Sequence, residues 1–158
     1  MPYRERVPAA GWFRWFIRLA ALGPVAIVLV ASFVAMDGGT GERIAAAVTA
    51  VLTGAVVLAI DQWFMVLLVT ADHDGLEARF GPFHTRLDAR DLFSATDAPY
   101  RWTQYGGWGI RGLGKRRAWS VPFLRTGVEF VMHDGRHVYV SSRTPRALVE
   151  AVGREPRQ

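Results

Sequence analysis

Two uncharged stretches decide the fold: Leu19–Met36, LAALGPVAIVLVASFVAM, and Ile44–Ile60, IAAAVTAVLTGAVVLAI. Each is close to or above the length of about 18 residues that a membrane-spanning helix needs. The second stretch continues past Asp61. The short polar connection Asp37–Arg43 leaves room only for antiparallel neighbours. The sequence therefore predicts a two-helix transmembrane hairpin over residues 19–64.

Two alternatives to spanning helices are open to the first stretch. Its apolar part is longer than the roughly 7–15 residues of a signal peptide. A second apolar stretch also follows at once. Buried core helices of a soluble protein would show a polar face, which neither stretch has. We therefore expect both stretches to remain in the chain and to span the bilayer.

Charged and aromatic residues predict the orientation of this hairpin. Four arginines precede the first stretch, opposed only by Glu5, whereas the connection carries Arg43 against two acidic residues. The positive-inside rule then places the N-terminus in the cytoplasm, and two spans return the C-terminal part there. We expect a cell inner (plasma) membrane location with both termini cytoplasmic. The expected interface anchors are Trp12, Arg14, Trp15, Arg18 and Trp63.

The charge and the cysteine content of the chain limit the kinds of functional site it can have. The net charge is +5, and about +3 of it lies in the first 18 residues beside the apolar stretch. The absence of cysteine excludes disulfides, thiolate catalysis and cysteine zinc sites.

We divide the chain into a basic aromatic N-terminal segment (1–18), the hairpin (19–64), a mainly-β domain (65–153) and a tail (154–158).

Short segments after the hairpin predict strands at Met65–Ala71, Leu76–Phe80, Tyr100–Tyr105, Ala118–Phe123, Val128–Met132 and Arg136–Ser141. Thr85–Asp88 and Leu92–Ala95 are predicted as two further strands, or as a strand and one loose turn. Asp74-Gly75 and Asp134-Gly135 predict two-residue hairpin turns. Thr144 as N-cap, Pro145 as first helical residue and Gly153 as stop predict a final helix. The pattern favours a small barrel or sandwich closed by this helix.

The segment Tyr105-Gly106-Gly107-Trp108-Gly109-Ile110-Arg111 resembles a signature of bacterial pleckstrin-homology-like (PH-like) domains that follow paired membrane helices. The order of elements is also similar over Trp63–Val152. The resemblance implies a seven-stranded bent barrel capped by a C-terminal helix. It implies no activity, because such domains are generally uncharacterised binding or scaffold modules. The tethered β-domain and the lack of a nucleophile–base set in the sequence favour a membrane-anchored, non-catalytic binding or scaffold protein. Eukaryotic domains of this shape often bind phosphoinositides, but here the first hairpin, around Asp74, is acidic.

A basic aromatic cluster is the candidate contact surface, and it comprises Trp108, Arg111, Lys115, Arg116, Arg117 and Trp119. Such a cluster can attract anionic headgroups, bind single-stranded nucleic acid, contact a protein partner or remain a solvated loop. Because the domain is tethered to the bilayer, lipid is nearer than nucleic acid. We expect the bilayer as a partner, with another membrane protein as a further candidate, and no nucleic acid.

Several motif fragments lack the context that their chemistry needs. Gly107–Gly112 matches G-x-G-x-x-G, but turn and strand residues follow it where a dinucleotide site needs a helix. Gly112–Lys115 imitates part of a P-loop, but Arg116 stands where serine or threonine must bind magnesium. His133 and His137, across a two-residue turn, would pair with Arg136 and Met132 and lie on opposite faces. We expect no cofactor, no metal and no enzymatic activity.

Two features of the hairpin leave alternatives open. Asp61 is either solvated at the membrane edge or a functional carboxylate. Small residues at every fourth position of the second stretch are either a helix-packing surface or alanine-rich filler. As a packing surface they would face the first stretch or a separate chain, which makes an accessory subunit of a membrane complex the alternative function. These residues are Ala46, Ala50 and Gly54, with Ala31 and Ala35 opposite.

Overall fold

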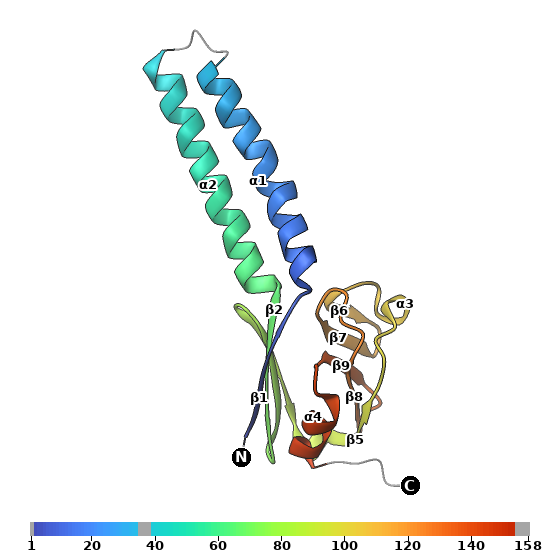
Figure 1. Ribbon diagram of the computed structural model, residues 1–158. Coiled ribbons are helices and arrows are strands. Elements are labelled where there is room, and N and C mark those ends of the chain that lie inside the picture. The colour runs from blue at the N-terminus through green and yellow to red at the C-terminus, as the bar shows by residue number, and fades with distance from the viewer. Residues whose placement is uncertain (1, 35–38, 154–158) are drawn as a thin grey trace. The chain divides into compact units, whose positions relative to one another are not determined.

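The computed structural model describes residues 2–34 and 39–153 and divides the chain into two compact units (Figure 1). The helix pair is Gly11–Trp63, and the β-domain combines Met1–Ala10 with Phe64–Gln158. The first residues thus belong to the β-domain instead of forming a separate segment up to residue 18. The helix pair is an insertion within the chain of the β-domain.

The helix pair consists of α1 (Gly11–Val34) and α2 (Thr40–Phe64). α1 begins at Gly11 and not at Leu19, because no proline or second glycine interrupts the residues between them. Each helix contains a segment long and apolar enough to cross a membrane. Residues 35–38, which hold the end of the first predicted span and the start of the connection, lie outside the described residues.

The first sheet of the β-domain is antiparallel, in the order β1-β2-β3-β4. Its strands are β1 (Tyr3–Pro8), β2 (Val66–Asp72), β3 (Gly75–Phe80) and β4 (Phe83–Asp88). β1 pairs with β2 along its whole length, from Tyr3 opposite Ala71 to Pro8 opposite Val66. Val7 is fully buried, whereas its neighbour Arg6 is exposed. This alternation makes β1 a half-buried strand.

The second sheet has the order β5-β8-β9-β7-β6. Its strands are β5 (Leu92–Asp97), β6 (Gly109–Leu113), β7 (Arg116–Ser120), β8 (Gly127–Met132) and β9 (His137–Ser141). β7 and β9 run parallel, and the other neighbours are antiparallel. A short 3₁₀ turn, η1 (Ala89–Asp91), leads from the first sheet into β5.

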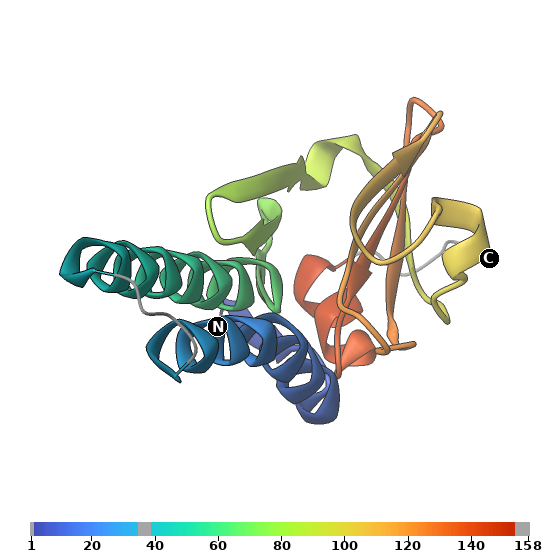
Figure 2. The same cartoon turned by 90° about the horizontal axis from the view of Figure 1, so that it is seen from above.

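The core lies between the two sheets, which Figure 2 shows as separate layers. α4 (Pro145–Val152) packs against β1 and β2 of one sheet and β5 and β8 of the other. Its residues Leu148 and Val152 are buried. Phe80 of β3 stacks on Trp119 of β7, with ring centroids 6.1 Å apart. Two sheets, a connecting core and a closing helix therefore form the β-domain.

Both predicted hairpin turns are shifted. Asp72 pairs with Gly75, so the first loop is His73-Asp74 and Gly75 begins β3. The second loop is 133–136, between the end of β8 at Met132 and the start of β9 at His137, and His137 pairs with Val131. The prediction of a two-residue turn at Asp134-Gly135, with His137 opposite Met132, was wrong. At both loops an aspartate side chain, Asp72 or Asp134, accepts a hydrogen bond from the backbone N–H two residues later, which favours a turn conformation.

The final helix begins and ends where the sequence predicts. Pro145 is its first residue, and Gly153 ends it in the left-handed conformation at φ 68°. Thr144 precedes the helix, but its side chain makes no capping hydrogen bond. Its hydroxyl instead lies 2.9 Å from the Tyr3 hydroxyl of β1. The N-terminal strand therefore takes the contact expected to cap the helix.

Candidate functional site: an aromatic surface of the β-domain

The segment expected as a strand from Tyr100 to Tyr105 is instead a single helical turn, α3 (Trp102–Tyr105). Gly106 ends it at φ 76°, and Gly107 continues the turn at φ 117°. Both values are in the region that residues other than glycine rarely adopt. The glycines of the Tyr105–Arg111 signature thus carry the chain from α3 into β6, a strand not predicted from the sequence.

Three tyrosine rings in mutual contact hold this turn against the second sheet. The ring of Tyr100 lies 5.5 Å from that of Tyr105 and 4.8 Å from that of Tyr139, measured between centroids. The Tyr100 hydroxyl donates to the carbonyl of Gly107. Burial raises the pKa of Tyr105 and of Tyr139, so both hydroxyls stay neutral. The three tyrosines, here called the tyrosine base, therefore hold α3 and the glycines that follow it against the second sheet.

Next to this base lies a cluster, here called the aromatic surface, formed by the partly buried Trp108 and the exposed residues Trp102, Ile110 and Phe123. The ring of Trp108 lies 6.5 Å from that of Trp102 and 4.8 Å from that of Phe123. Trp102 is 57% exposed and Phe123 44% exposed. Contiguous exposed apolar groups of this kind mark contact sites with proteins or membranes.

Phe123 carries backbone strain as well as exposure. Its φ of 63° makes it the one residue other than glycine with positive φ among the described residues. The conformation costs a bulky side chain on the order of 1–3 kcal/mol. It lifts the ring away from the core and onto Trp108. A strained backbone at a partly exposed apolar ring makes Phe123 a candidate contact residue.

An apolar cavity of about 350 Å³ adjoins the aromatic surface. Trp108 and Ile110 line both. The cavity also includes Phe64, where α2 ends, and Phe80 from the first sheet. Arg111 lies at its wall and donates from Nε to the carbonyl of Trp108, which holds the guanidinium beside the aromatic rings. The site thus combines apolar rings with one positioned cation.

The predicted basic cluster is only partly gathered at this site. Arg111 and Trp108 belong to it. Lys115 lies in the turn between β6 and β7, and the next residue, Arg116, donates to the side chain of Gln104. Arg117 pairs with Gly112 within the sheet. Arg111 is thus the predicted cation that hydrogen-bonds to Trp108, whereas Arg116 is bonded to α3.

Trp119 was predicted as a surface contact, and that prediction was wrong. Its side chain is 7% exposed and stacks on Phe80 inside the core. The strand β7 alternates, so Ala118 faces the tyrosine base while Trp119 faces the first sheet. Trp102 and Phe123, in contrast, were not predicted as contacts. Phe123 follows Pro122, but the neighbours of Trp102 are Arg101 and Thr103, so no local pattern marks both.

In the helix pair, Asp61 is buried and not solvated, contrary to the favoured expectation. Its side chain has no exposed surface and accepts hydrogen bonds from Arg14 and Arg18. Arg14 and Arg18 are one turn apart on α1, so both guanidinium groups reach the same carboxylate. The guanidinium of Arg18 also lies 5.8 Å from the Trp15 ring centroid. Two expected interface anchors are therefore members of an ion cluster.

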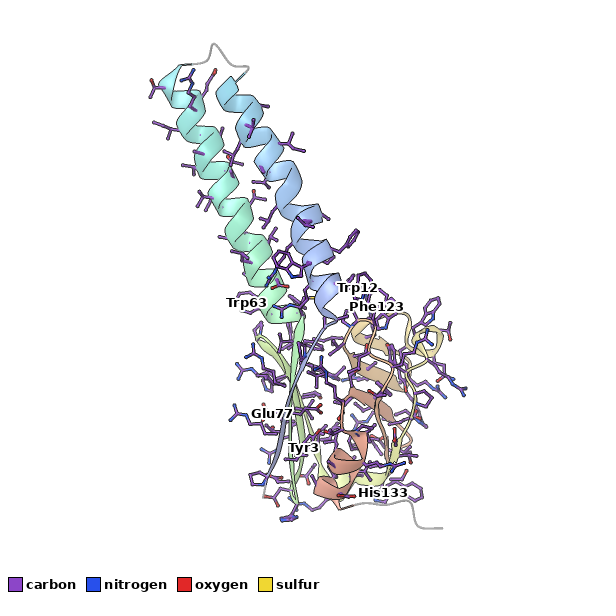
Figure 3. All side chains as sticks on the ribbon, in the orientation of Figure 1. Tyr3, Trp12, Trp63, Glu77, Phe123 and His133 are labelled. Atoms are coloured by element: carbon purple, nitrogen blue, oxygen red, sulfur yellow. The ribbon has the colours of Figure 1, made fainter. Side chains whose placement is uncertain are left out.

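The aromatic anchors expected at this end of the helix pair are exposed. Trp12 and Trp15 are 61% and 63% exposed, and Trp63 is 50% exposed. Figure 3 shows Trp12 and Trp63 at the same end of the two helices. This arrangement suits an aromatic belt, because indole rings favour the headgroup level of a bilayer.

The small residues of α2 face α1. Ala46, Ala50 and Gly54 are partly buried, and a Cβ atom at Gly54 would lie 3.9 Å from the Leu22 side chain of α1. The expected partner Ala31 is exposed and does not take part, and Ala35 lies outside the described residues. Crosslinks from this face would therefore report on α1 before any separate chain.

His133 and His137 make separate contacts. His137 Nδ1 lies 3.0 Å from Glu129 Oε1, and His133 packs edge-on to Phe93. Among the described residues, no group of three or more potential metal ligands comes together.

Comparisons of the chain with protein-family models, with curated proteins and with solved structures gave no match. The site is therefore interpreted from its own geometry: exposed aromatic rings beside a cation, on a domain whose chain is interrupted by two apolar helices.

Proposed function

We propose that the protein is a membrane-anchored, non-catalytic binding or scaffold protein whose cytoplasmic, PH-like β-domain contacts the bilayer through its aromatic surface. The helix pair is the anchor. The aromatic rings of Trp102, Trp108 and Phe123 enter the headgroup region, and Arg111 meets anionic phosphate. Amphipathic rings favour this depth, and basic residues near a negative surface add about 1 kcal/mol each.

The pairing of β1 with β2 is the observation that carries this proposal. β1 precedes the helix pair and β2 follows it, yet the two strands are joined along six residue pairs. A spanning hairpin with its ends joined in this way must present both ends on one side of the membrane. The excess of arginines before α1 favours the cytoplasmic side.

The PH-like assignment is supported by two packed sheets and a closing C-terminal helix. One sheet has four strands and the other five. The chain departs from the expected seven-stranded pattern in two places. β1 is contributed from before the helix pair, and β7 pairs in parallel with β9.

Cysteine labelling tests the topology without background, because the chain contains no cysteine. Arg4→Cys lies on β1, Gly41→Cys at the start of α2 and Glu150→Cys on α4, and all three positions are exposed. In intact cells, a membrane-impermeant maleimide should label only Gly41→Cys. Arg4→Cys and Glu150→Cys should react after permeabilisation. Reaction of Glu150→Cys in intact cells would place the β-domain outside, and opposite results for Arg4→Cys and Glu150→Cys would contradict the hairpin.

The membrane contact is testable on a joined β-domain, in which Asn-Gly replaces residues 11–63. Two residues are enough to join the chain here, because the Ala9 N–H already donates a hydrogen bond to the carbonyl of Met65. The two ends left by removing residues 11–63 therefore lie close together. A fragment beginning at residue 71 would lack β1 and most of β2. We expect the joined domain to float with vesicles of phosphatidylcholine and phosphatidylglycerol. Phe123→Ser should weaken this binding about tenfold, since a buried phenylalanine contributes about 1.5–3 kcal/mol.

Phe93→Ser is the matched control, because Phe93 is 64% exposed and lies in contact with His133. Figure 3 shows Phe123 and His133 at opposite ends of the β-domain. Equal losses for Phe93→Ser and Phe123→Ser would exclude the aromatic surface as the contact site. Equal binding with and without phosphatidylglycerol would exclude the role of Arg111.

A further inference from the structure

The ion cluster of the helix pair joins three charged side chains in one place. Arg14 forms a fork with Asp61, Nε to Oδ1 at 3.2 Å and Nη2 to Oδ2 at 2.9 Å. Arg18 contacts Oδ2 through Nε at 3.2 Å and through Nη2 at 2.5 Å. Such charge-assisted contacts hold both guanidinium groups in fixed orientations.

The lengths of the helices place this cluster at the edge of a bilayer if the pair spans it. From Leu19 to Val34, α1 is uncharged for about 24 Å at 1.5 Å per residue. From Ile44 to Ile60, α2 is uncharged for about 25 Å. Both lengths approach the hydrocarbon thickness of about 30 Å. The cluster therefore lies where the hydrocarbon meets the headgroups, which is the level of lipid phosphate.

The cluster also has unused capacity for an anion. Two guanidinium groups and one carboxylate leave one net positive charge. A guanidinium carries five N–H donors, and each arginine directs two toward Asp61. The side chains of Arg14 and Arg18 are 23% and 29% exposed, so donors reach the surface of the helix pair. Planar guanidinium groups suit phosphate oxygens better than ammonium groups do.

We propose that Arg14 and Arg18, oriented by Asp61, form a binding site for a phosphate monoanion, supplied by the headgroup of an anionic phospholipid. Asp61 offsets one of the two positive charges and leaves the pair attractive to a single negative one. The Trp15 ring lies 5.8 Å from the Arg18 guanidinium and would meet the same headgroup. This site belongs to the helix pair, rests on its insertion in a membrane, and is separate from the aromatic surface.

The test uses the full chain in neutral detergent, with native mass spectrometry of retained phosphatidylglycerol against phosphatidylcholine. In Asp61→Asn the cluster charge rises to +2, and the preference for phosphatidylglycerol should increase about fivefold. In the triple variant Arg14→Gln/Arg18→Gln/Asp61→Asn the cluster is neutral with no buried charge unpaired, and the preference should be lost. Arg43→Gln, near the other end of α2, lowers the net charge by one, as the triple variant does, and should leave the preference unchanged.

The outcomes show whether the proposal fails and whether the bound phosphate comes from a lipid headgroup or from solution. The proposal is overturned if wild type, Asp61→Asn and the triple variant share one preference, or if Asp61→Asn lowers it. An equal loss in Arg43→Gln would show general charge attraction and overturn it as well. Inorganic phosphate that displaces the lipid identifies free phosphate as a second source, whereas lipid that stays in place identifies the headgroup. The joined β-domain lacks this cluster, so failure here and failure of the aromatic surface are distinguishable.

Discussion

Val7→Asp is expected to unfold the β-domain. Val7 has no exposed surface and pairs with Leu67 in the strand that the N-terminus adds to the first sheet. A carboxylate there would be buried without a partner, which costs on the order of 4 kcal/mol. Small domains have about 5–15 kcal/mol of total stability, so most of it would be lost. Urea unfolding of the joined β-domain, followed by circular dichroism, measures the change.

Arg6→Asp is the control for this prediction, because it introduces the same side chain at the next position of β1. Arg6 is exposed, so its free energy of unfolding should change by about 0.5 kcal/mol or less. A similar loss of stability in Val7→Asp and Arg6→Asp would mean that a negative charge on β1 destabilises the β-domain whether or not it is buried. No loss at either position would mean that β1 contributes nothing to the β-domain.

Gly75→Ala is expected to have the second large effect. Gly75 begins β3 at φ 146°, and a Cβ atom there would lie 2.1 Å from the Leu87 carbonyl oxygen and 3.0 Å from the Ala89 nitrogen. Both are backbone atoms, so the clash is relieved only if β4 moves away. Strain and overlap together should cost about 4 kcal/mol. The same unfolding measurement gives the value.

Gly112→Ala provides the comparison, because a Cβ there meets its nearest atom, the Arg116 carbonyl oxygen, at 3.6 Å and φ is not positive. We expect a change of about 1 kcal/mol or less. If Gly75→Ala is as stable as Gly112→Ala, then β3 and β4 are not held at the distance described. The pair thus separates the cost of close backbone packing from that of a lost glycine.

Much of the fold was predictable from local pattern. The predicted helices coincide with α1 and α2 over their uncharged parts because polar residues are absent there for many turns. Strands β2, β3, β8 and β9 lie where alternating residues predicted them. The final helix follows from Pro145 and Gly153, whose backbone preferences act within a single turn.

The errors have a common cause in contacts between distant residues. Tyr3, Glu5 and Val7 alternate with Arg4 and Arg6, but six residues form a strand only beside a partner, and β2 lies beyond the whole helix pair. The N-terminal charges were therefore interpreted as membrane anchors alone. Glu5 in fact accepts hydrogen bonds from Ser142 and from the backbone of Arg143, just before α4.

The candidate site, too, was predictable only in part. Its residue types were visible in the sequence, and Trp108 and Arg111 were chosen correctly as neighbours. Which aromatic residues lie outside could not be known. Trp119 is buried against Phe80 while Trp102 and Phe123 are exposed, because burial depends on which face of β7 meets the first sheet.

By itself, the sequence determined two apolar helices, several short strands, a closing helix and the absence of cysteine chemistry. These depend on the polarity and backbone preference of residues close together in the chain. Only the tertiary structure decided that β1 joins β2, that Asp61 is paired with Arg14 and Arg18, and that a strained Phe123 is exposed. Each depends on free energy gained between residues far apart in sequence, which no local pattern records.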